Sequence, residues 1–382
     1  MLKIITVVGA RPQIIKAAAL SRTIRKSFAH KIEEIIIHTG QHYDENMSEV
    51  FFKELEIPKA NYNLNVGSGA HGAQTATMIK GIEDILIEEK PNYLVLYGDT
   101  NSTLAGAIAA SKIHIPIVHI EAGLRSFNKS MPEEINRIMC DHASTFLFSP
   151  TSTGFQNLKK EGFSVNKGKY TMDNPGIFHC GDVMYDNSLY FSAISEVKST
   201  ISKDLELYEK NFNLVTIHRN NNTDDVERLS NIFEGLLEIA ENSKKMMVLP
   251  LHPRTKNRLD SLYTDLVLRI HQSPFLEIVD PVSFLDMIQL EKNADLIITD
   301  SGGVQKEAYF FSKPCIVLRK ETEWVEIVEA GTAVLVDADP EGMKKAYDVL
   351  STAKHKFPPI FGNGNAAKFI CDTLIKNSSI SS

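Results

Sequence analysis

The chain has 382 residues, a length that favours two domains, since single domains average about 150 residues. Hydrophobic residues make up 43% and charged residues 23% of the sequence, as in ordinary globular proteins, which excludes a disordered chain and a coiled coil. The formal net charge of −7 argues against binding of bulk nucleic acid, but it is compatible with a local basic pocket for a phosphate group.

Targeting and metal-binding signals are missing from the sequence. No apolar run approaches the roughly 18 residues that span a membrane. The first residues, Met1–Gly9, lack the basic segment and the cleavage site of a signal peptide. The four cysteines are scattered and form no CxxC motif or Cys/His cluster. We therefore expect a cytoplasmic protein with no membrane segment, no disulfide framework and no structural metal.

Short apolar runs rich in β-branched residues alternate with amphipathic stretches along the chain. Strands of a parallel sheet are buried on both faces and have near-continuous apolar sequences, so this alternation predicts a doubly wound α/β fold. The first series of predicted strands comprises Ile4–Val8, Glu34–His38, Tyr93–Tyr97, Ile115–Ile120 and Thr145–Phe148. The second series comprises Asn213–Ile217, Met246–Leu249, Leu276–Val279, Leu296–Thr299, Cys315–Leu318 and Ala333–Val336.

The two series are separated by Lys167–Asn187, a segment with several glycines and a proline that predicts a domain boundary. We assign residues 1–172 and 173–362 to two Rossmann-like domains and residues 363–382 to a closing helix and tail. Two such domains are expected to face a cleft. Ligands of such sheets bind beyond the carboxyl ends of the strands, so functional residues are expected directly after strands.

The segment Gly9–Lys16 follows the first predicted strand and opens a helix. A helix N-terminus carries unpaired N–H groups and a partial positive charge, and both attract anions. Arg11 and Lys16 add full charges nearby. The segment is therefore either a phosphate or leaving-group site, or a plain helix start with two solvated cations.

A second loop of this kind, Asp300–Glu307, follows the predicted strand Leu296–Thr299. Ser301, Gly302 and Gly303 allow backbone N–H groups to approach a pyrophosphate at a helix start. Glu307, one turn into the helix, can accept hydrogen bonds from ribose hydroxyls. We favour nucleotide binding over a Gly-rich helix cap, because two such loops in two domains suggest one shared ligand.

Two other motifs are interpreted as plain loops. Gly67–Gly72 matches the GxGxxG pattern, but it follows an Asn-rich segment and does not lie in the first βα unit, so the context required for dinucleotide binding is missing. Asp337–Asp339 resembles a metal-binding DxD, but it precedes Pro340 in a late turn. No nicotinamide cofactor and no metal are expected.

Acidic residues follow consecutive elements of the first domain. Asp99 and Glu121 end two strands, and Glu133 and Glu134 open a helix. Taken singly, each of these residues is more often a helix cap or part of a surface ion pair. Asp99, Glu121 and one of the two glutamates are expected to meet at one edge of the sheet. Crowded carboxylates can supply both an acid and a base, which favours catalysis.

Cationic residues follow strands of the second domain. His218 can be a phosphate-bound cation or a proton shuttle, and Arg219 can bind an oxyanion through two N–H groups. His252, after the next strand, is a weaker candidate of the same kind. Arg319 and Glu323, after Cys315–Leu318, are expected at the edge of the same cleft.

These motifs, in this order, resemble the non-hydrolysing UDP-N-acetylglucosamine 2-epimerase family over nearly the whole chain. The resemblance implies a GT-B-like fold, a homodimer and no metal or other cofactor. The segments that carry it are GARPQxIK (Gly9–Lys16), HTGQH (His38–His42), YGDTNSTLAGA (Tyr97–Ala107), HIEAGLRS (His119–Ser126), PEEINR (Pro132–Arg137), His218–Arg219, HPR (His252–Arg254) and DSGGVQKEA (Asp300–Ala308).

The resemblance also implies roles for individual residues. It places acid/base catalysis on Asp99, Glu121, Glu133 and His218. It places Arg11 and Lys16 near the leaving diphosphate. UDP binding falls to Arg219, Ser301, Gly302, Gly303 and Glu307, with Arg319 and Glu323 close by, and Phe284 near the uracil.

The implied reaction interconverts UDP-GlcNAc and UDP-ManNAc by elimination of UDP to a 2-acetamidoglucal and its re-addition, in the synthesis of surface polysaccharide precursors. The His-Arg-x-Glu-Asn of the family is His218–Asn222 here, which lacks the carboxylate, and Thr322–Trp324 looks like the branch that acts on UDP-2,3-diacetamido-2,3-dideoxyglucuronate. The sequence therefore leaves the sugar open. It is also compatible with a GT-B glycosyltransferase, a hydrolysing epimerase or a UDP-sugar sensor without activity.

Overall fold

The computed structural model describes residues 1–40, 58–165, 168–207, 211–262 and 265–378, so Gln41 and His42 of the HTGQH motif lie outside the described residues. The chain divides into two compact units. The first comprises Met1–Asn187 and Pro359–Ser382, and the second comprises Ser188–Pro358. No helix among the described residues combines the length and the apolar character needed to cross a bilayer.

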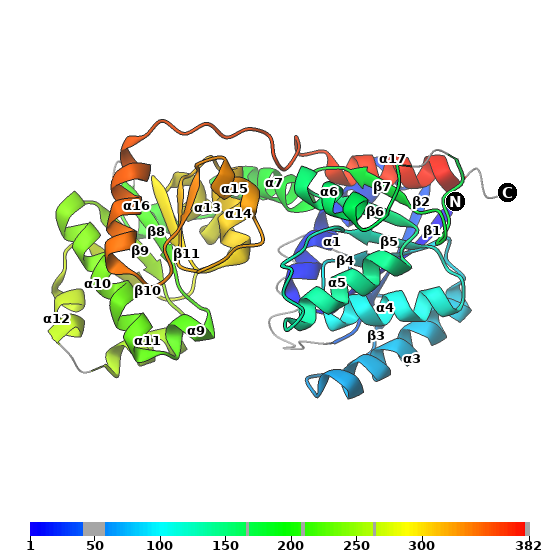
Figure 1. Cartoon of the computed structure of the whole chain (residues 1–382), viewed down its shortest axis with the longest axis horizontal. Helices are drawn as coiled ribbons and strands as arrows, with labels where there is room; N and C mark the ends of the chain where they lie inside the picture. The colour runs from blue at the N-terminus through cyan, green and yellow to red at the C-terminus, as the bar shows by residue number, and fades with distance from the viewer. Residues whose placement is uncertain (41–57, 166–167, 208–210, 263–264, 379–382) are drawn as a thin grey trace. The chain divides into compact units, whose positions relative to one another are not determined.

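The first unit is built on a seven-stranded parallel sheet in the order β3-β2-β1-β4-β5-β6-β7 (Figure 1). The strand order reverses between the neighbours β1 and β4, which is the switch point where sheets of this kind bind ligands. The strands are β1 (Leu2–Val8), β2 (Ile32–His38), β3 (Tyr62–Asn63), β4 (Tyr93–Tyr97), β5 (Ile117–Ile120), β6 (Phe146–Ser149) and β7 (Gly176–His179).

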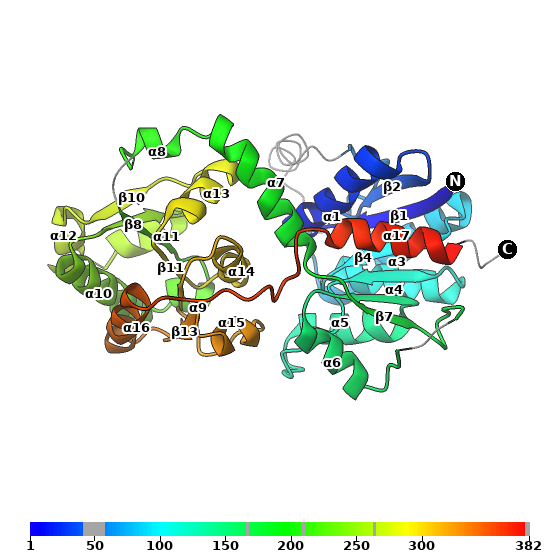
Figure 2. The same ribbon diagram turned by 90° about the horizontal axis from the view of Figure 1, so that it is seen from above.

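Helices cover both faces of this sheet, with α3, α4 and α5 against one face and α17 along the other, beside α1 (Figures 1 and 2). Apolar residues of α3 and α4 pack against β1, β2 and β4 to form the core. The helices are α1 (Arg11–Thr23), continued by the π-helical turn η1 (Ile24–Phe28), α3 (His71–Glu89), α4 (Asn101–Lys112), α5 (Pro132–Ala143), α6 (Ser152–Lys160) and α17 (Ala366–Ser378), with α7 (Val183–Lys198) running across the division between the units.

The second unit repeats this plan with a six-stranded parallel sheet in the order β10-β9-β8-β11-β12-β13, which reverses between β8 and β11. Its strands are β8 (Phe212–Thr216), β9 (Met246–Pro250), β10 (Leu276–Val279), β11 (Leu296–Thr299), β12 (Cys315–Val317) and β13 (Ala333–Leu335). Its helices are α8 (Ile201–Asp204), α9 (Asn220–Thr223), α10 (Val226–Ser243), α11 (Pro253–Asp260), α12 (Asp265–Gln272), α13 (Phe284–Asn293), α14 (Gly302–Phe310), α15 (Val325–Glu329) and α16 (Pro340–Thr352). The apolar sides of α10 and α16 share the core with the strands.

The α/β fold is confirmed, but the first domain extends further than the sequence predicted. The predicted boundary after residue 172 places β7 outside the first domain, whereas Gly176–His179 pairs with β6 and completes the first sheet. The C-terminal helix α17 also belongs to this unit. Strands β3 and β7 were not predicted, because both are short edge strands in segments rich in Asn, Gly and Pro.

Candidate functional site

In both units, predicted site residues follow the two strands where the strand order reverses. Gly9 follows β1, and Asp99 lies two residues beyond β4. In the second unit, His218 lies two residues beyond β8, and Asp300 directly follows β11. The switch points of doubly wound sheets are where their ligands bind. Each unit thus presents polar groups at the expected edge of its sheet.

The turn after β1 is held by a buried amide side chain. Oε1 of Gln13 accepts a hydrogen bond of 2.9 Å from the N–H of Gly9, and its Nε2 donates 3.1 Å to the carbonyl oxygen of Tyr97. A Cβ atom at Gly9 would lie 2.1 Å from Oγ of Ser102, so only glycine fits there. This packing fixes the start of α1, from which the exposed Arg11 extends.

Lys16 forms a largely buried ion pair with Glu121, just beyond β5. Gly98 lies beneath the pair, since a Cβ atom there would be 3.0 Å from Oε2 of Glu121 and 3.1 Å from Nζ of Lys16. Its φ of +61° is a second reason for glycine. The φ of Glu121 is +77°, a left-handed conformation that is uncommon for a residue with a side chain and that occurs at functional sites.

Asp99 pairs with Arg137 of α5, and Nδ2 of Asn136 donates 2.9 Å to the backbone carbonyl of Asp99. Burial raises the pKa of the Asp99 carboxyl, and Glu121 raises it further, against the opposing charges of Arg137 and Lys16. A carboxyl shifted in this way exchanges its proton closer to neutral pH. Asp99, Glu121 and Lys16 therefore form one electrostatic cluster, as the sequence predicted for the two acids.

The two glutamates that open α5 have different surroundings. Glu134 is buried, and its carboxylate accepts hydrogen bonds from the N–H groups of Ser126 and Phe127 at 2.9 and 3.0 Å. It also pairs with Arg137 at 3.2 Å. Glu134 is therefore a structural residue that fixes the loop before α5. Glu133 is exposed in the first turn of the helix, and its catalytic role stays a prediction.

In the second unit, the fully buried Asp300 organises the loop after β8. Its carboxylate accepts hydrogen bonds from the N–H groups of His218 and Arg219 at 3.1 and 3.0 Å and from Nδ2 of Asn222 at 3.1 Å. Nδ1 of His218 also lies 3.1 Å from the carboxylate. Burial alone would raise the pKa of Asp300, but His218, Arg219 and Asn222 hold it below its usual value. The His218 side chain itself is exposed.

The Ser301 loop forms the N-terminus of α14. Oγ of Ser301 accepts a hydrogen bond from the N–H of Val304 at 3.4 Å. A Cβ atom at Gly302 would lie 2.4 Å from Oε1 of Glu323, and Nε1 of Trp324 donates 3.0 Å to the Gly302 carbonyl. The absence of a side chain at Gly302 thus lets the loop of Glu323 and Trp324 pack over the start of α14. Gly303 is exposed, so the N-terminal end of α14 stays accessible.

A hollow of about 810 Å³ in the second unit is lined by the segments that follow β8 and β12, and the Ser301 loop is not among the described residues that line it. Arg219 and Arg319, both predicted to bind UDP, line it, and Arg319 pairs with Glu323 at 3.0 Å. The complete lining is Arg219, Asn220, Asn221, Asp224, Asp225, Arg228, Arg319, Lys320, Glu321 and Asp337. Its four cations are matched by four carboxylates, so the lining has no net formal charge, and its guanidinium and amide groups suit a hydrogen-bonding ligand.

Two residues that the sequence predicted to bind substrate, His252 and Phe284, make contacts with other residues of the second unit. Nδ1 of His252 accepts a hydrogen bond from the N–H of Arg254 at 3.3 Å and so caps α11. Phe284, the first residue of α13, packs edge-on against Phe191 with ring centroids 5.2 Å apart. Neither residue is among the described residues that line the hollow. Their roles in binding stay predictions.

Glu307, the predicted ribose ligand, lies beside a second carboxyl group, Glu291 of α13. Glu291 is 1% exposed, and neither of its carboxyl oxygens receives a hydrogen bond from a donor within the described part of the chain. Burial and the charge of Glu307 raise the pKa of Glu291 well above its usual value. Burial and the neighbouring charge of Glu307 therefore favour the protonated form of Glu291.

Replacing Glu291 with Gln should stabilise the protein more at neutral than at acidic pH. The pKa of Glu291 is higher in the folded than in the unfolded protein. Its contribution to the free energy of unfolding is therefore fully present below its ordinary pKa of 4.5 and is lost progressively as pH rises above that value. Chemical unfolding from about pH 5 to about pH 7 should show the advantage of E291Q growing by about 1.4 kcal/mol per pH unit. The exposed Glu241→Gln is the control, and an advantage independent of pH would contradict a neutral Glu291.

Comparison with known proteins agrees with the motifs. A family model described as UDP-N-acetylglucosamine 2-epimerase matches residues 25–375. A UDP-N-acetylglucosamine 2-epimerase homolog of Methanococcus maripaludis is 48% identical over 374 residues, which cover 98% of this chain and 99% of that protein. The UDP-2,3-diacetamido-2,3-dideoxy-D-glucuronate 2-epimerase of Pseudomonas aeruginosa is 46% identical over 376 residues, covering 98% of this chain and 100% of that protein.

A solved structure has the same fold along its whole length. The crystal structure of Methanocaldococcus jannaschii UDP-GlcNAc 2-epimerase in complex with UDP-GlcNAc and UDP matches with a TM-score of 0.83 at 42% identity, covering 98% of this chain and 100% of that one. Family model, sequence relatives and structure agree over both units, and the chain belongs to the UDP-N-acetylglucosamine 2-epimerase family.

Proposed function

We propose that this protein is a non-hydrolysing UDP-N-acetylglucosamine 2-epimerase, which interconverts UDP-GlcNAc and UDP-ManNAc. The observation that carries this proposal is the cluster of Asp99, Glu121 and Lys16 beyond the first sheet, in a chain of this family. Two carboxylates beside one cation are the groups that proton transfer next to a departing anion requires.

In the proposed reaction, the bond between C1 of the sugar and UDP breaks before the C2 hydrogen is removed. The C2 hydrogen of the sugar is not next to a ketone, so its direct removal is costly. Departure of UDP from C1 produces an oxocarbenium-like centre, which makes the C2 hydrogen acidic. The intermediate is a 2-acetamidoglucal, and UDP adds back after a proton has reached the other face of C2.

The predicted roles follow from this sequence of steps. Asp99, Glu121, Glu133 and His218 exchange protons. Arg11, Lys16 and Arg219 stabilise the diphosphate together with the N–H groups of the Ser301 loop. Glu307 accepts hydrogen bonds from the ribose hydroxyls.

A second candidate is the same reaction on UDP-2,3-diacetamido-2,3-dideoxyglucuronate, which yields the mannuronate epimer. The relative that is 46% identical over nearly all of both chains and carries that name favours it. Both substrates share the UDP group, C1 and the C2 hydrogen, so the roles given to Asp99, Glu121 and Lys16 apply to either sugar.

The biological setting is part of the proposal. We propose a cytoplasmic homodimer that supplies surface polysaccharide precursors, because nucleotide sugars of this kind are building blocks for such polymers. Size-exclusion chromatography with light scattering tests the dimer, which should elute at twice the chain mass of 42.7 kDa. A monomer at micromolar concentration would contradict it.

The substrate is tested by offering both UDP-sugars separately and following their C1 and C2 protons by NMR. We expect one of the two to equilibrate with its C2 epimer while it stays attached to UDP. Release of free N-acetylmannosamine and UDP would identify a hydrolysing epimerase, and transfer of the sugar to an added acceptor would identify a glycosyltransferase.

A further inference from the structure

A fully buried histidine of β5, His119, lies two residues before Glu121 and contacts the turn that carries Asp99. Its Nε2 is 2.8 Å from the carbonyl oxygen of Gly98, and its Nδ1 is 2.6 Å from Oδ1 of Asp141. A backbone carbonyl and an ionised carboxylate are both acceptors. Each ring nitrogen therefore has to carry a hydrogen, which makes His119 an imidazolium cation.

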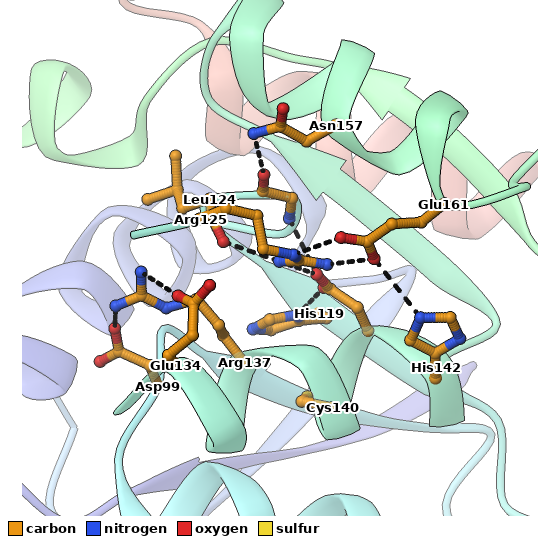
Figure 3. A network of polar contacts seen from close by, with 12 residues as sticks. Asp99, His119, Leu124, Arg125, Glu134, Arg137, Cys140, His142, Asn157 and Glu161 are labelled. Carbon is orange, nitrogen blue, oxygen red and sulfur yellow. Dashed lines mark hydrogen bonds and ion pairs between the residues drawn. The ribbon is translucent and has the colours of Figure 1, made fainter. Parts of the chain in front are cut away.

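The charges around His119 form an alternating chain. Asp141 is fully buried and accepts from Nη1 of Arg125 at 2.7 Å as well as from His119. Arg125 in turn donates two hydrogen bonds, of 2.6 and 2.7 Å, to the carboxylate of Glu161 (Figure 3). With His119 positive, the two cations His119 and Arg125 match the two carboxylates Asp141 and Glu161. A neutral imidazole would also leave one ring nitrogen without a hydrogen while it faces an acceptor.

The electrostatics agree with this geometry. Burial by itself would lower the pKa of His119, but the neighbouring Cys140 and Asp141 raise it well above its usual value. Burial likewise opposes the ionisation of Asp141, and His119 and Arg125 overcome it, so that the pKa of Asp141 lies below its usual value. Both directions favour the charged forms of His119 and Asp141, in agreement with the hydrogen bonds.

This ion pair is tied to both turns that carry the predicted acids. The Gly98 peptide is held on both sides, since its N–H donates 3.0 Å to the Ile120 carbonyl while its carbonyl accepts from His119. Beyond the other turn, the N–H of Gly123 donates 3.1 Å to Asp141. Asp99 follows Gly98 directly, and Glu121, with its left-handed backbone, lies between Ile120 and Gly123.

We propose that His119 is a positioning residue, a permanent cation that holds the turns of Asp99 and Glu121 in the mutual geometry that proton transfer at C2 requires. This proposal rests on the proposed function, because it takes these two carboxylates as the acid/base groups. His119 itself has no path to the substrate, since both of its nitrogens are engaged within the unit.

The test is His119→Gln, which fills similar space but has no positive charge and cannot reach both acceptors. We expect kcat to fall about 100-fold while KM for the UDP-sugar changes less than about threefold, because a displacement of about 1 Å at reacting groups has that effect. His142→Gln is the matched control at the exposed end of the network, beside Glu161, and should leave kcat unchanged. An unchanged kcat in a folded H119Q protein would overturn the proposal.

A measurement on the unsubstituted protein keeps the proposal testable if H119Q does not fold. In ¹⁵N-histidine-labelled protein, both ring nitrogens of His119, assigned through bonds to its backbone, should stay protonated from about pH 6 to about pH 9. A neutral tautomer in that range would overturn the proposal. Failure of the proposed function is distinguishable from failure of this proposal. Full activity in Asp99→Asn would refute the catalytic role of Asp99, whereas an inactive D99N with an active H119Q refutes only the role of His119.

Discussion

The Asp99→Asn protein should bind UDP almost as the unsubstituted protein does and turn over the UDP-sugar about 10²- to 10⁴-fold more slowly, the usual contribution of a general acid or base. Asparagine keeps the shape of the side chain and leaves the hydrogen bond from Asn136 to the backbone carbonyl intact. It removes the ionisable group whose pKa burial raises towards neutrality. Epimerisation followed by NMR and UDP binding followed by calorimetry separate the two effects.

The control for this experiment is Asp84→Asn, because Asp84 is an exposed carboxylate of α3 in the same unit, paired only with Lys80 on its own helix within the described residues. Its turnover should be unchanged. If D99N retained full turnover, Asp99 would lose its catalytic role. If D99N lost UDP binding together with turnover, Asp99 would be a residue that organises the first unit.

The Asp300→Asn protein should bind UDP about 10- to 100-fold more weakly, because one of the two oxygens that receive N–H groups becomes an NH₂ donor. The donors that must then compete for the one remaining oxygen belong to His218, Arg219 and Asn222, which shape the loop after β8. Each buried donor without a partner costs about 1–3 kcal/mol, so the free energy of unfolding should also fall by about that amount. Calorimetric titration with UDP measures the first effect and chemical unfolding the second.

Asp295→Asn is the matched control, because Asp295 lies directly before β11, at the opposite end from Asp300, and pairs with Lys245 in a half-exposed ion pair. Its affinity for UDP should be unchanged. UDP affinity that survives in D300N would show that the loop of His218 and Arg219 does not depend on this carboxylate, or does not contact the nucleotide.

The strands that carry the site could be predicted from the sequence because they are buried on both faces. Ile4–Val8 and Tyr93–Tyr97, for example, lie within β1 and match β4. The edge strands β3 and β7 could not, since an edge strand of two to four residues needs no apolar run. The predicted boundary between the units lies too early for the same reason, because the sequence of β7 resembles that of a linker.

Residues directly after strands could also be predicted, since strand order alone brings Asp99 and Glu121 to one edge. Partners that come from other elements could not. The sequence does not show that Arg137 pairs with Asp99 or that Glu291 lies against Glu307, because both contacts depend on how helices pack. Asp300 is the first residue of the DSGGVQKEA motif, but a carboxylate before a glycine-rich turn gives no sign that it will be fully buried.

The most direct test of the proposed chemistry is epimerisation in D₂O. If an acidic residue removes the C2 hydrogen and another group returns a proton from solvent, the product should carry deuterium at C2 and ordinary hydrogen at C1, as NMR and mass spectrometry can show. A product that keeps its original hydrogen at C2 would contradict proton abstraction and with it the roles given to Asp99 and Glu121.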